Sequence, residues 1–449
     1  MSATNRSVGV DAVHRHPPPR KEPAVPPEPA HRSVLGGVAR SAWVYWPLWC
    51  ATRALVVAMA VGPLRISAMD VTSDVSVIYR GWFEVLRSGT FPMDDVTWQY
   101  PPAAAVVIIL PGALAAALGC SYLTGFLALV AAFDAAAAWL LRRASRGRRA
   151  AGAWYWLIGV PLLGPTVYAR YDLVVTAVAV AALLLSVRRP AVGGALAGLG
   201  AMLKVWPVLT VLGLPRGRRF RDAVVACAAS VLALGFFFAV AAHGAYAFLG
   251  FQENRGVEVE SLGGIVFQIA RAFGWPGSVS MNYGSLEFLG PGVGVVAKAS
   301  VALTAAAFGW LLLWRWRARR WSAATPFDAA LVALLLFTAT SRVISPQYLV
   351  WLLGLAAVCL LMPGSSQRPV AWLLLPAAAL TTVEFPVLFG DVVSGHPLGV
   401  VVLTVRNALL AVATLWGARR LWRATTSAPP TQPPVTAQRR APQAREFAP

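Results

Sequence analysis

The sequence predicts an all-α membrane protein, a polytopic bundle of transmembrane helices. Hydrophobic residues make up 57% of its 449 residues and charged residues only 13%, whereas soluble chains carry roughly 25% charged residues. Apolar runs of about 17 to 25 residues recur along the chain, and this length crosses a ~30 Å hydrocarbon core. The runs lack the alternation of polar and apolar residues that is typical of outer-membrane barrels.

The formal charge of +20 comes largely from basic clusters at the ends of apolar runs. The positive-inside rule explains this placement and makes the clustered loops cytoplasmic. We therefore expect membrane lipid, and no nucleic acid, as the partner of the basic surface. The clusters are "RRASRGRR" (142–149), Arg188–Arg189, "RGRRFR" (216–221), "RWRARR" (315–320) and "RRLWR" (419–423).

About twelve crossings, with both tails inside, agree with every basic cluster. The run 191–215 carries "LKVWP" in its middle and has basic residues at both ends, so we expect two short half-helices that meet near the outer face. The expected segments are 43–63, 101–119, 122–142, 150–168, 173–187, 191–215, 222–242, 292–314, 327–341, 348–362, 369–389 and 396–418, with outer regions at about 64–100 and 243–291.

The run 101–119 conflicts with this count. A full crossing there would place "RRASRGRR" outside. Pro111 interrupts the backbone hydrogen bonds of a helix, so we expect a Pro-broken segment that either enters and returns or lies along the surface. The sequence leaves both arrangements open.

The two ends of the chain, 1–40 and 425–449, are expected to be disordered cytoplasmic tails. Their stretches "HRHPPPRKEPAVPPEPAHR" and "TTSAPPTQPPVTAQRRAPQAREFAP" are too rich in proline and polar residues to bury a core. The apolar run at 43–63 begins too late for a cleaved secretory signal and reads as an uncleaved first helix. Residues 41–424 then form the transmembrane domain.

The cysteines and histidines predict neither a disulfide framework nor a metal site. Cys50, Cys120, Cys227 and Cys359 lie in or beside apolar runs without CxxC spacing, so we expect free core thiols. His243 and His396 are isolated loop residues without ligand partners in the sequence.

Most acidic residues fall at or beyond the expected outer face, although orientation does not require it. An external polar site explains this bias, and so does the solvation of outer loops. Asp74, Tyr79, Trp82, Phe83 and Leu86 follow helical spacing and predict an interfacial helix with aromatic rings at headgroup depth. An acid at the start of this helix is either a cap for backbone N–H groups or a site residue.

Three further charged residues lie in apolar surroundings. Lys204 lies in the middle of its run, and an intramembrane ionisable residue is a functional hypothesis by default. Snorkelling to the interface is the alternative for this lysine. Arg170 and Asp172 in "YARYD" are expected either to pair with each other or to belong to the site.

Seven motifs occur in order along the membrane region. Over about residues 43–420 their order and spacing resemble the bacterial polyprenyl-phosphate-mannose-dependent α-mannosyltransferases of glycosyltransferase family 87, in the GT-C superfamily. The motifs are "SDVSVIY" (73–79), "GTFPMDDVTWQYPP" (89–102), "YARYDLVVTAV" (168–178), "AMLKVWPVL" (201–209), "GVEVESLGG" (256–264), "SRVISPQYLVWLL" (341–353) and "TTVEFPVLFG" (381–390).

The resemblance implies a GT-C-type bundle in the bacterial plasma membrane with its active site facing outside. Such enzymes transfer a sugar from a polyprenyl-phosphate donor to a glycolipid or glycan acceptor with inversion. Their first outer loop supplies a carboxylate as general base, which matches Asp74, with Asp70 as the alternative. Lys204 would stabilise the leaving phosphate.

The same resemblance implies further contacts. Arg342, Gln347 and Tyr348 match a segment near the donor and would contact its phosphate or sugar. Glu260 matches an element that we expect to position acceptor or sugar, although at a helix start it can also be a favourable dipole partner. No obligatory metal or other cofactor is implied.

A lipid or sugar transporter, or a flippase, is the alternative function. Transporters often contain inverted repeats with broken helices at the midplane, and "LKVWP" resembles one such break. The other half of the chain holds no second copy of it, and an outer region rich in acids favours extracellular chemistry.

Overall fold

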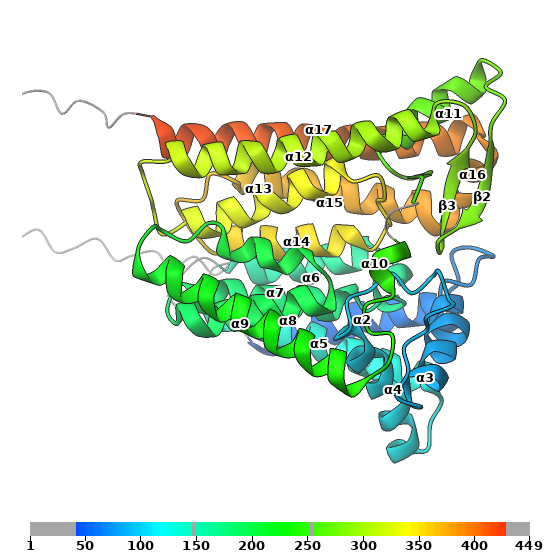
Figure 1. The fold of residues 1–449 in the computed structure, drawn as a ribbon, viewed down its shortest axis with the longest axis horizontal. Coiled ribbons are helices and arrows are strands. Elements are labelled where there is room, and N and C mark those ends of the chain that lie inside the picture. Colours follow the sequence, from blue (N-terminus) through cyan, green and yellow to red (C-terminus); the bar gives the residue numbers. More distant parts are fainter. Residues whose placement is uncertain (1–41, 146–149, 252–254, 428–449) are drawn as a thin grey trace, which may run out of the picture. The chain divides into compact units, whose positions relative to one another are not determined.

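The computed structural model of the protein describes residues 42–145, 150–251 and 255–427. These residues form a helical bundle with one small sheet (Figure 1). The elements are α2 (Ala42–Val61), η1 (Asp74–Tyr79), α3 (Arg80–Leu86), α4 (Ala104–Leu118), α5 (Tyr122–Ala144), α6 (Ala151–Leu162), η2 (Pro165–Tyr168), α7 (Asp172–Ser186), α8 (Pro190–Leu203), η3 (Trp206–Val211), α9 (Arg218–Ala241), α10 (Phe248–Phe251), β1 (Val257–Glu258), α11 (Gly264–Ala272), β2 (Ser278–Asn282), β3 (Ser285–Leu289), α12 (Val293–Arg317), α13 (Thr325–Thr340), α14 (Tyr348–Leu360), α15 (Arg368–Thr382), η4 (Val383–Val387), α16 (Phe389–Ser394) and α17 (Pro397–Thr426).

The predicted all-α polytopic bundle is confirmed. Within the described ranges, six helices are long and apolar enough to cross a membrane: α2, α5, α9, α12, the segment α15–η4, which is kinked at Phe385, and α17. The shorter apolar helices α4, α6, α7, α8, α13 and α14 complete the set. Each expected run thus coincides with a helix, while the number that cross the bilayer stays a prediction.

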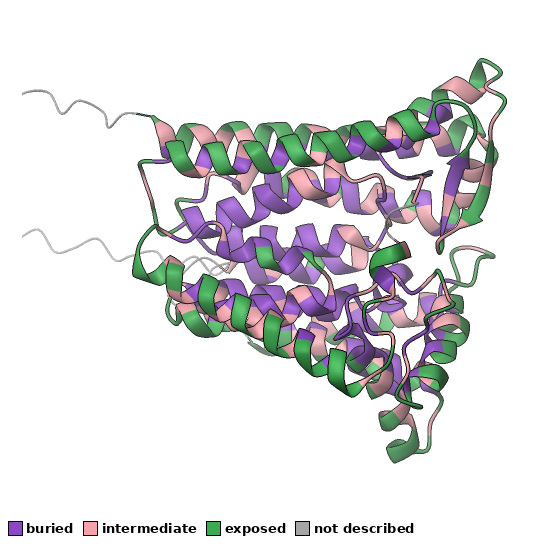
Figure 2. Cartoon of the chain, viewed as in Figure 1, coloured by how far each residue is buried: buried purple, intermediate pink, exposed green. Residues whose placement is uncertain are grey.

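The helices α7, α13 and α14 form the buried centre. Every residue of α14 from Leu349 to Leu360 is buried, whereas α9 and α12 expose large apolar side chains such as Leu232 and Leu303. Figure 2 shows this contrast between a buried interior and exposed outer helices. Because exposing such side chains to water is unfavourable, the outer surface is suited to lipid.

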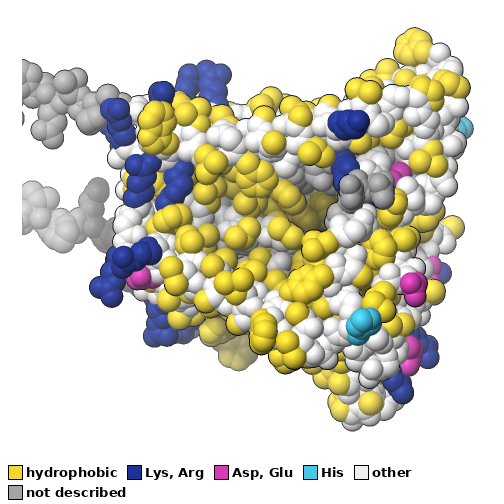
Figure 3. All heavy atoms as spheres, in the orientation of Figure 1, with side chains coloured by type: hydrophobic (Ala, Val, Ile, Leu, Met, Phe, Trp, Pro, Cys, Tyr) yellow, Lys and Arg dark blue, Asp and Glu magenta, His cyan; other side chains and the backbone are white. Residues whose placement is uncertain are grey.

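The two ends of the bundle differ in charge. In Figure 3 most visible Lys and Arg side chains gather at the end where α12 and α17 finish, and most visible acids lie at the opposite end. We call these the basic end and the loop end; the loop end carries 62–103 and the β-sheet. This separation is the one that the positive-inside rule predicts.

The central helices are too short to reach both ends. α7, α8, α13 and α14 contain 15, 14, 16 and 13 residues, which is about 20–24 Å of helix against a ~30 Å hydrocarbon core. At the loop end they stop at Asp172, Leu203, Thr340 and Tyr348. Their short length leaves space there for a cavity.

Lys204 lies where the chain turns back between α8 and η3. Its backbone is extended, with φ −161° and ψ 128°, and η3 follows as a 3₁₀ helix. The predicted pair of short helices around "LKVWP" is therefore confirmed. Two glycines allow α8 to pack closely against α9. A Cβ at Gly194 would lie 2.0 Å from the Ala223 carbonyl oxygen, and a Cβ at Gly198 would lie 2.5 Å from the Cys227 carbonyl oxygen.

The predicted break at Pro111 is wrong. α4 is one continuous helix with Pro111 inside it. Its proline turn is supported by α5: a Cβ at Gly125 would lie 2.4 Å from the Pro111 carbonyl oxygen, and Tyr122 Oη donates to the Ile108 carbonyl at 2.8 Å. Neighbouring groups of this kind let a membrane helix tolerate proline. In Figure 1, α4 lies beside α3 and runs across the direction of α12 and α17, which favours the surface-lying alternative.

The helix predicted to begin at Asp74 is present as a π-helical segment, η1, that continues into α3. Two of its aromatic rings pack inside the protein, while their depth in the membrane stays a prediction. Tyr79 and Trp82 are only 2% and 4% exposed, since Tyr79 packs on Phe126 and Tyr171 and Trp82 packs on Trp98. Neighbouring aromatic residues of the protein, rather than lipid, surround these two rings.

The sheet in the region 243–291 was not expected from the sequence. Its antiparallel strands are ordered β1-β3-β2, and β2 and β3 pair from Ser278↔Leu289 to Asn282↔Ser285. Their two-residue turn places Tyr283 at φ 48° and Gly284 at φ 78°, the positive φ values that a tight hairpin turn of the I′ type requires. β1 has only two residues, too few to show an alternating pattern.

The predicted tails, 1–40 and 425–449, lie almost entirely outside the described residues. Their inner boundary needs one correction, because α17 continues to Thr426. Thr425 contacts the end of α12 and the residues that follow it: its hydroxyl accepts from Trp314 Nε1 at 2.9 Å, and its carbonyl accepts from the backbone N–H of Arg319.

The four cysteines are free, as predicted. Cys227 and Cys359 are buried thiols, but Cys50 is exposed and is not the core thiol that we expected. The reason is that α2 packs against the bundle through one face only, which includes Tyr45, Arg53 and Val56 and does not include Cys50.

A buried ion pair joins α2, α5, α6 and η2. Arg53 Nε donates to Asp134 Oδ2 at 2.7 Å, and both side chains are almost fully buried. Asp134 also accepts from Trp156 Nε1 at 2.7 Å and from Tyr168 Oη at 2.8 Å. The carboxylate is thus well compensated, and the contact with Tyr168 anchors the turn that carries Arg170.

Replacing Asp134 with alanine is expected to destabilise the protein by about 3–5 kcal/mol, because the Arg53 charge is left buried without its partner. The measurement is thermal unfolding of the purified protein in detergent. Asp222→Ala is the control, since its pair with Arg218 is solvent-accessible, with an N–O distance of 3.6 Å, and should change stability by at most about 1 kcal/mol. Equal effects of the two substitutions would contradict a stabilising role for the buried pair of Arg53 and Asp134.

Candidate active site

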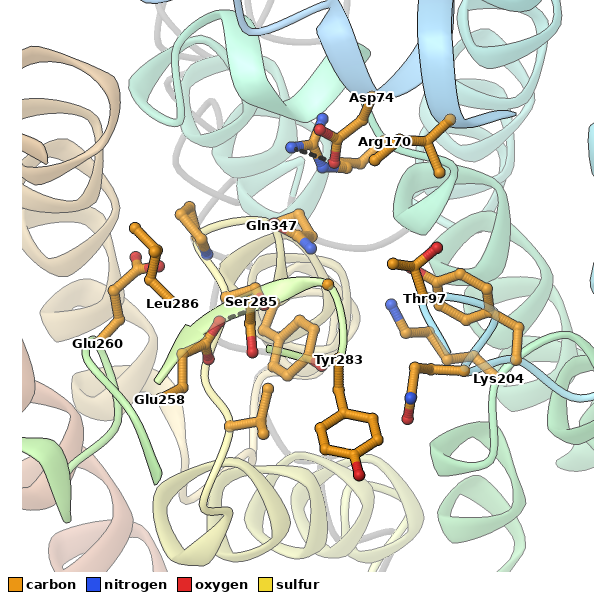
Figure 4. Close-up of a pocket in the computed structure, with 18 of the residues that line it drawn as sticks. Asp74, Thr97, Arg170, Lys204, Glu258, Glu260, Tyr283, Ser285, Leu286 and Gln347 are labelled. Carbon is orange, nitrogen blue, oxygen red and sulfur yellow. Dashed lines mark hydrogen bonds and ion pairs between the residues drawn. The ribbon is translucent and has the colours of Figure 1, made fainter. Parts of the chain in front are cut away.

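A cavity of about 670 Å³ lies beyond the loop-end termini of the central helices. The segment 69–101, the sheet and the segment 341–348 surround it. Figure 4 shows Asp74 and Arg170 on one wall, Glu258 and Glu260 on another, and Lys204 with Thr97 on a third. Charged groups from distant parts of the chain therefore face one space.

Seven of the eight predicted site residues line this cavity, and Asp172 lies directly behind one of them, Lys204. They come from η1, from the turns around α7 and α8, from the sheet region and from the start of α14. The lining members are Asp74, Arg170, Lys204, Glu260, Arg342, Gln347 and Tyr348.

Asp74 forms an ion pair with Arg170. Arg170 Nη2 lies 2.7 Å from Asp74 Oδ2, and the Asp74 side chain is 35% exposed. Arg170 also donates to the carbonyls of Ala169 at 2.7 Å and Val71 at 3.2 Å. The expected alternative, in which Arg170 pairs with Asp172, is wrong because each residue has a different partner. The arginine fixes one carboxylate oxygen of Asp74 at the edge of the cavity.

Lys204 is held by Asp172 and by four aromatic rings. Its Nζ donates to Asp172 Oδ1 at 2.7 Å, and the same oxygen accepts from Trp351 Nε1 at 2.8 Å. The rings of Tyr100, Tyr171, Tyr348 and Trp351 lie 4.9–5.4 Å from Nζ, within cation–π range. The ammonium therefore does not snorkel away, because these groups fix it at the cavity wall.

Asp70 also lines the cavity, but its surroundings differ from those of Asp74. Its Oδ1 accepts from the Thr72 hydroxyl at 2.7 Å and from the Thr72 backbone N–H at 2.9 Å. The hydroxyl hydrogen bond lowers the pKa of Asp70. This carboxylate shapes its own turn and is less basic than an ordinary aspartate.

Glu260 belongs to a buried group of three charges. Arg406 Nη2 lies 3.6 Å from Glu260 Oε1 and 3.2 Å from Glu384 Oε2, and all three residues are buried. Burial, followed by the nearby Glu384 charge, raises the pKa of Glu260 well above its ordinary value. One arginine between two carboxylates favours a proton retained on the pair.

Glu258 is buried on the cavity wall without an ion pair among the described residues. Its Oε1 accepts from Ser345 Oγ at 3.3 Å, and its Oε2 is buried without any hydrogen-bond partner. Burial is the main cause that raises the pKa of Glu258 from 4.5 to about 7, against the lowering effect of Arg255.

This raised pKa predicts a pH-dependent stability. Between pH 4.5 and about 7 the folded state binds more protons at Glu258 than the unfolded state, so the free energy of unfolding falls as pH rises through this window. We expect the melting temperature to fall more between pH 5 and pH 8 in the wild type than in Glu258→Gln. Identical pH profiles of the two proteins would contradict a raised pKa at this residue.

Besides Glu258, the sequence missed three parts of the site. Arg255 lines the cavity and reaches Glu287 Oε1 at 3.3 Å, Tyr283 reaches it from the hairpin turn, and Arg406 holds Glu260. Only Arg406 carried a usable signal, because an arginine in the middle of the last apolar run is an intramembrane charge.

The arrangement combines cations with carboxylates around one cavity. Arg170, Lys204, Arg255 and Arg342 line it, so it can bind an anionic group such as a phosphate, while Asp74 can accept a proton. In the described part of the chain, no three or more His, Cys, Asp and Glu side chains are placed to hold a metal ion.

Comparison with known families assigns the chain. The model of glycosyltransferase family 87 matches residues 98–346, which is more than half of the sequence and includes Arg170, Lys204, Glu260 and Arg342. No curated protein and no solved structure matches the chain. With its cavity at one end of a polytopic helical bundle, the chain belongs to glycosyltransferase family 87 and is a membrane glycosyltransferase.

Proposed function

We propose that the protein transfers a hexose, mannose in the first instance, from a polyprenyl-phosphate donor to a glycolipid or glycan acceptor. The observation that carries this proposal is the convergence of Asp74, Lys204 and Arg342 on one cavity. A proton acceptor and cations beside one space are the groups that transfer from a sugar phosphate needs.

The proposed chemistry is a single displacement. Asp74 takes the proton of the acceptor hydroxyl as its oxygen attacks C1 of the donor sugar. The bond between C1 and the phosphate oxygen breaks, the phosphate leaves with its electron pair, and the configuration at C1 inverts. Lys204 and Arg342 stabilise the negative charge that develops on the phosphate.

A lipid-linked donor is supported by the apolar part of the lining. Val205 and Leu249 line the cavity and are each 58% exposed, and Phe248 lies beside them. Figure 3 shows a hollowed face between α9 and α12 with hydrophobic side chains around it. Such a surface suits a polyprenyl chain better than a nucleotide.

An active site that faces outside the bacterial plasma membrane is supported by the charge separation. The cavity lies at the loop end, and the basic clusters lie at the other end of the bundle (Figure 3). The positive-inside rule directs basic clusters to the cytoplasm. The transporter alternative receives no support from the family match, which is to a glycosyltransferase.

The test is transfer of radiolabel in membranes that contain the protein. Polyprenyl-phosphate-[¹⁴C]mannose, polyprenyl-phosphate-[¹⁴C]glucose and GDP-[¹⁴C]mannose are supplied separately, and label in lipid-extractable and polymeric products is counted. We expect transfer from the polyprenyl-phosphate mannose and none from GDP-mannose when the membranes lack the enzyme that transfers mannose from GDP-mannose to polyprenyl phosphate. Transfer from GDP-mannose alone would overturn the donor assignment, and transfer of glucose alone would replace the sugar.

A further inference from the structure

We propose that the small sheet forms the wall of the cavity that binds a sugar ring, with Tyr283 as the platform for the ring and Glu258 as the acceptor for a sugar hydroxyl. This inference rests on the proposed function and assigns the sugar contact within the same cavity. It is carried by two independent features of the sheet, a tyrosine in a disfavoured backbone conformation and a buried carboxylate oxygen without a partner.

Tyr283 has an unusual backbone conformation. Within the described ranges it is the one residue other than glycine with a positive φ, 48°. It occupies the first position of a two-residue hairpin turn, where asparagine, aspartate or glycine is favoured. A bulky side chain there costs stability, and strain of this kind clusters at ligand sites. Tyr283 lines the cavity, so a ligand contact would explain why an unfavourable residue stands at this position.

The turn that carries Tyr283 is hydrogen-bonded to the residues around it. Glu287, fully buried beneath the turn, accepts from the Gly256 backbone N–H at 2.9 Å and from Asn282 Nδ2 at 3.2 Å. On its other side, a Cβ at Gly284 would lie 3.4 Å from Thr97 Cβ. The tyrosine ring is thus presented by a fixed hairpin that reaches the opposite segment of the cavity wall (Figure 4).

Glu258 supplies the polar half of the same wall. Its backbone N–H donates to the Arg342 carbonyl at 3.0 Å, which fixes β1 beside the segment that lines the cavity. Glu258 as a whole is 3% exposed, and its Oε2 has no hydrogen-bond partner. A buried acceptor without a hydrogen bond is costly, and a ligand hydroxyl would remove this cost.

The chemistry of this wall matches a pyranose. One face of a pyranose ring presents C–H groups that pack on an aromatic ring, and its rim presents hydroxyls that donate to a carboxylate. Sites for small polar ligands combine apolar and aromatic lining with few fixed polar groups. Of the two cations proposed for the phosphate, Lys204 lies on another wall (Figure 4) and Arg342 adjoins β1, so a sugar at the sheet would lie beside the phosphate.

The experiment uses variants that remove the proposed sugar contact. Each one also removes an unfavourable feature of the fold: the positive φ of a tyrosine, or the buried oxygen without a hydrogen bond. Tyr283→Asn places a residue suited to positive φ in the turn, and Glu258→Met replaces the carboxylate with an apolar side chain of similar length. We expect melting temperatures equal to or above wild type, with KM for the sugar substrate raised about tenfold or more. Tyr283→Phe, which keeps the ring, should retain the wild-type KM.

Two titrations distinguish whether the wall binds the sugar of the donor or the sugar of the acceptor. In one, polyprenyl-phosphate-[¹⁴C]mannose is varied, and in the other, octyl α-D-mannopyranoside is varied as acceptor. A raised KM in the first assigns the wall to the donor sugar, and in the second to the acceptor sugar. Ser280→Ala, an exposed residue of β2, and Glu84→Gln, an exposed carboxylate paired with Arg87, are controls that should change neither KM.

A binding measurement separates this proposal from the proposed function. Saturation-transfer NMR of methyl α-D-mannopyranoside with the full-length protein in nanodiscs needs no transfer reaction. We expect a signal in the wild type that Tyr283→Asn and Glu258→Met each weaken. Binding without any transfer would overturn the donor assignment alone. Unchanged binding and unchanged KM values in both variants would overturn the sugar-binding wall.

Discussion

Replacing Asp74 with asparagine is expected to reduce sugar transfer by about 10²–10⁴-fold, the range that a positioned general base contributes. The amide keeps the size of the side chain but cannot take the proton of the acceptor hydroxyl. Since Arg170 holds one oxygen of Asp74 at 2.7 Å, the carboxylate is oriented before substrate arrives, and this orientation is lost with the charge. Initial rates with polyprenyl-phosphate-[¹⁴C]mannose measure the effect.

Asp70→Asn is the matched control. Both carboxylates line the cavity, but the Asp70 carboxylate is engaged by Thr72, so we expect this variant to lose little activity. Binding of the donor should persist in Asp74→Asn, because the proton acceptor does not hold the phosphate. A variant at Asp74 with wild-type rates, or a loss confined to Asp70→Asn, would move the base to another residue.

Lys204→Met should lose both activity and stability. Removing a fixed donor or cation at the leaving phosphate is expected to lower kcat by about 10²–10³-fold. The same change leaves the Asp172 carboxylate, 1% exposed, without its ion-pair partner, which destabilises a protein by about 3–5 kcal/mol. Transfer assays and thermal unfolding in detergent measure the two effects.

The double variant Asp172→Asn with Lys204→Met separates these roles. Removing both charges eliminates the buried unpaired carboxylate, so the melting temperature should recover toward wild type while transfer stays low. Lys298→Met, at an exposed lysine of α12, should change neither property. If the double variant regained both stability and transfer, Lys204 would be a structural residue only.

Much of the architecture follows from local sequence properties. The length and spacing of apolar runs determine which segments are helices, because burying them in hydrocarbon depends on composition more than on particular partners. The position of "LKVWP" inside a run also predicted the turn at Lys204 correctly. The expected segments 173–187 and 348–362 were already short, but run lengths cannot reveal that the space this leaves at the loop end becomes a cavity.

The choice of partners inside the cavity required the tertiary structure. Asp74 and Arg170 are 96 positions apart, and Lys204 and Trp351 are 147 apart, so no local pattern shows that they meet. Sequence proximity suggested a pair between Arg170 and Asp172, yet neighbours at the start of α7 point to different partners.

The sheet is the clearest case of a feature that the sequence conceals. β1 has two residues, and β2 and β3 are joined through a turn with an unfavoured tyrosine, so neither length nor turn chemistry marks a hairpin there. Composition and the positions of charged residues are properties of the sequence itself. They were therefore sufficient to predict the membrane bundle and its charged candidate site residues. The wall that we propose for the sugar depends on strand pairing, on buried hydrogen bonds and on Glu258 Oε2, which has no hydrogen-bond partner. These features exist only once distant segments are packed together.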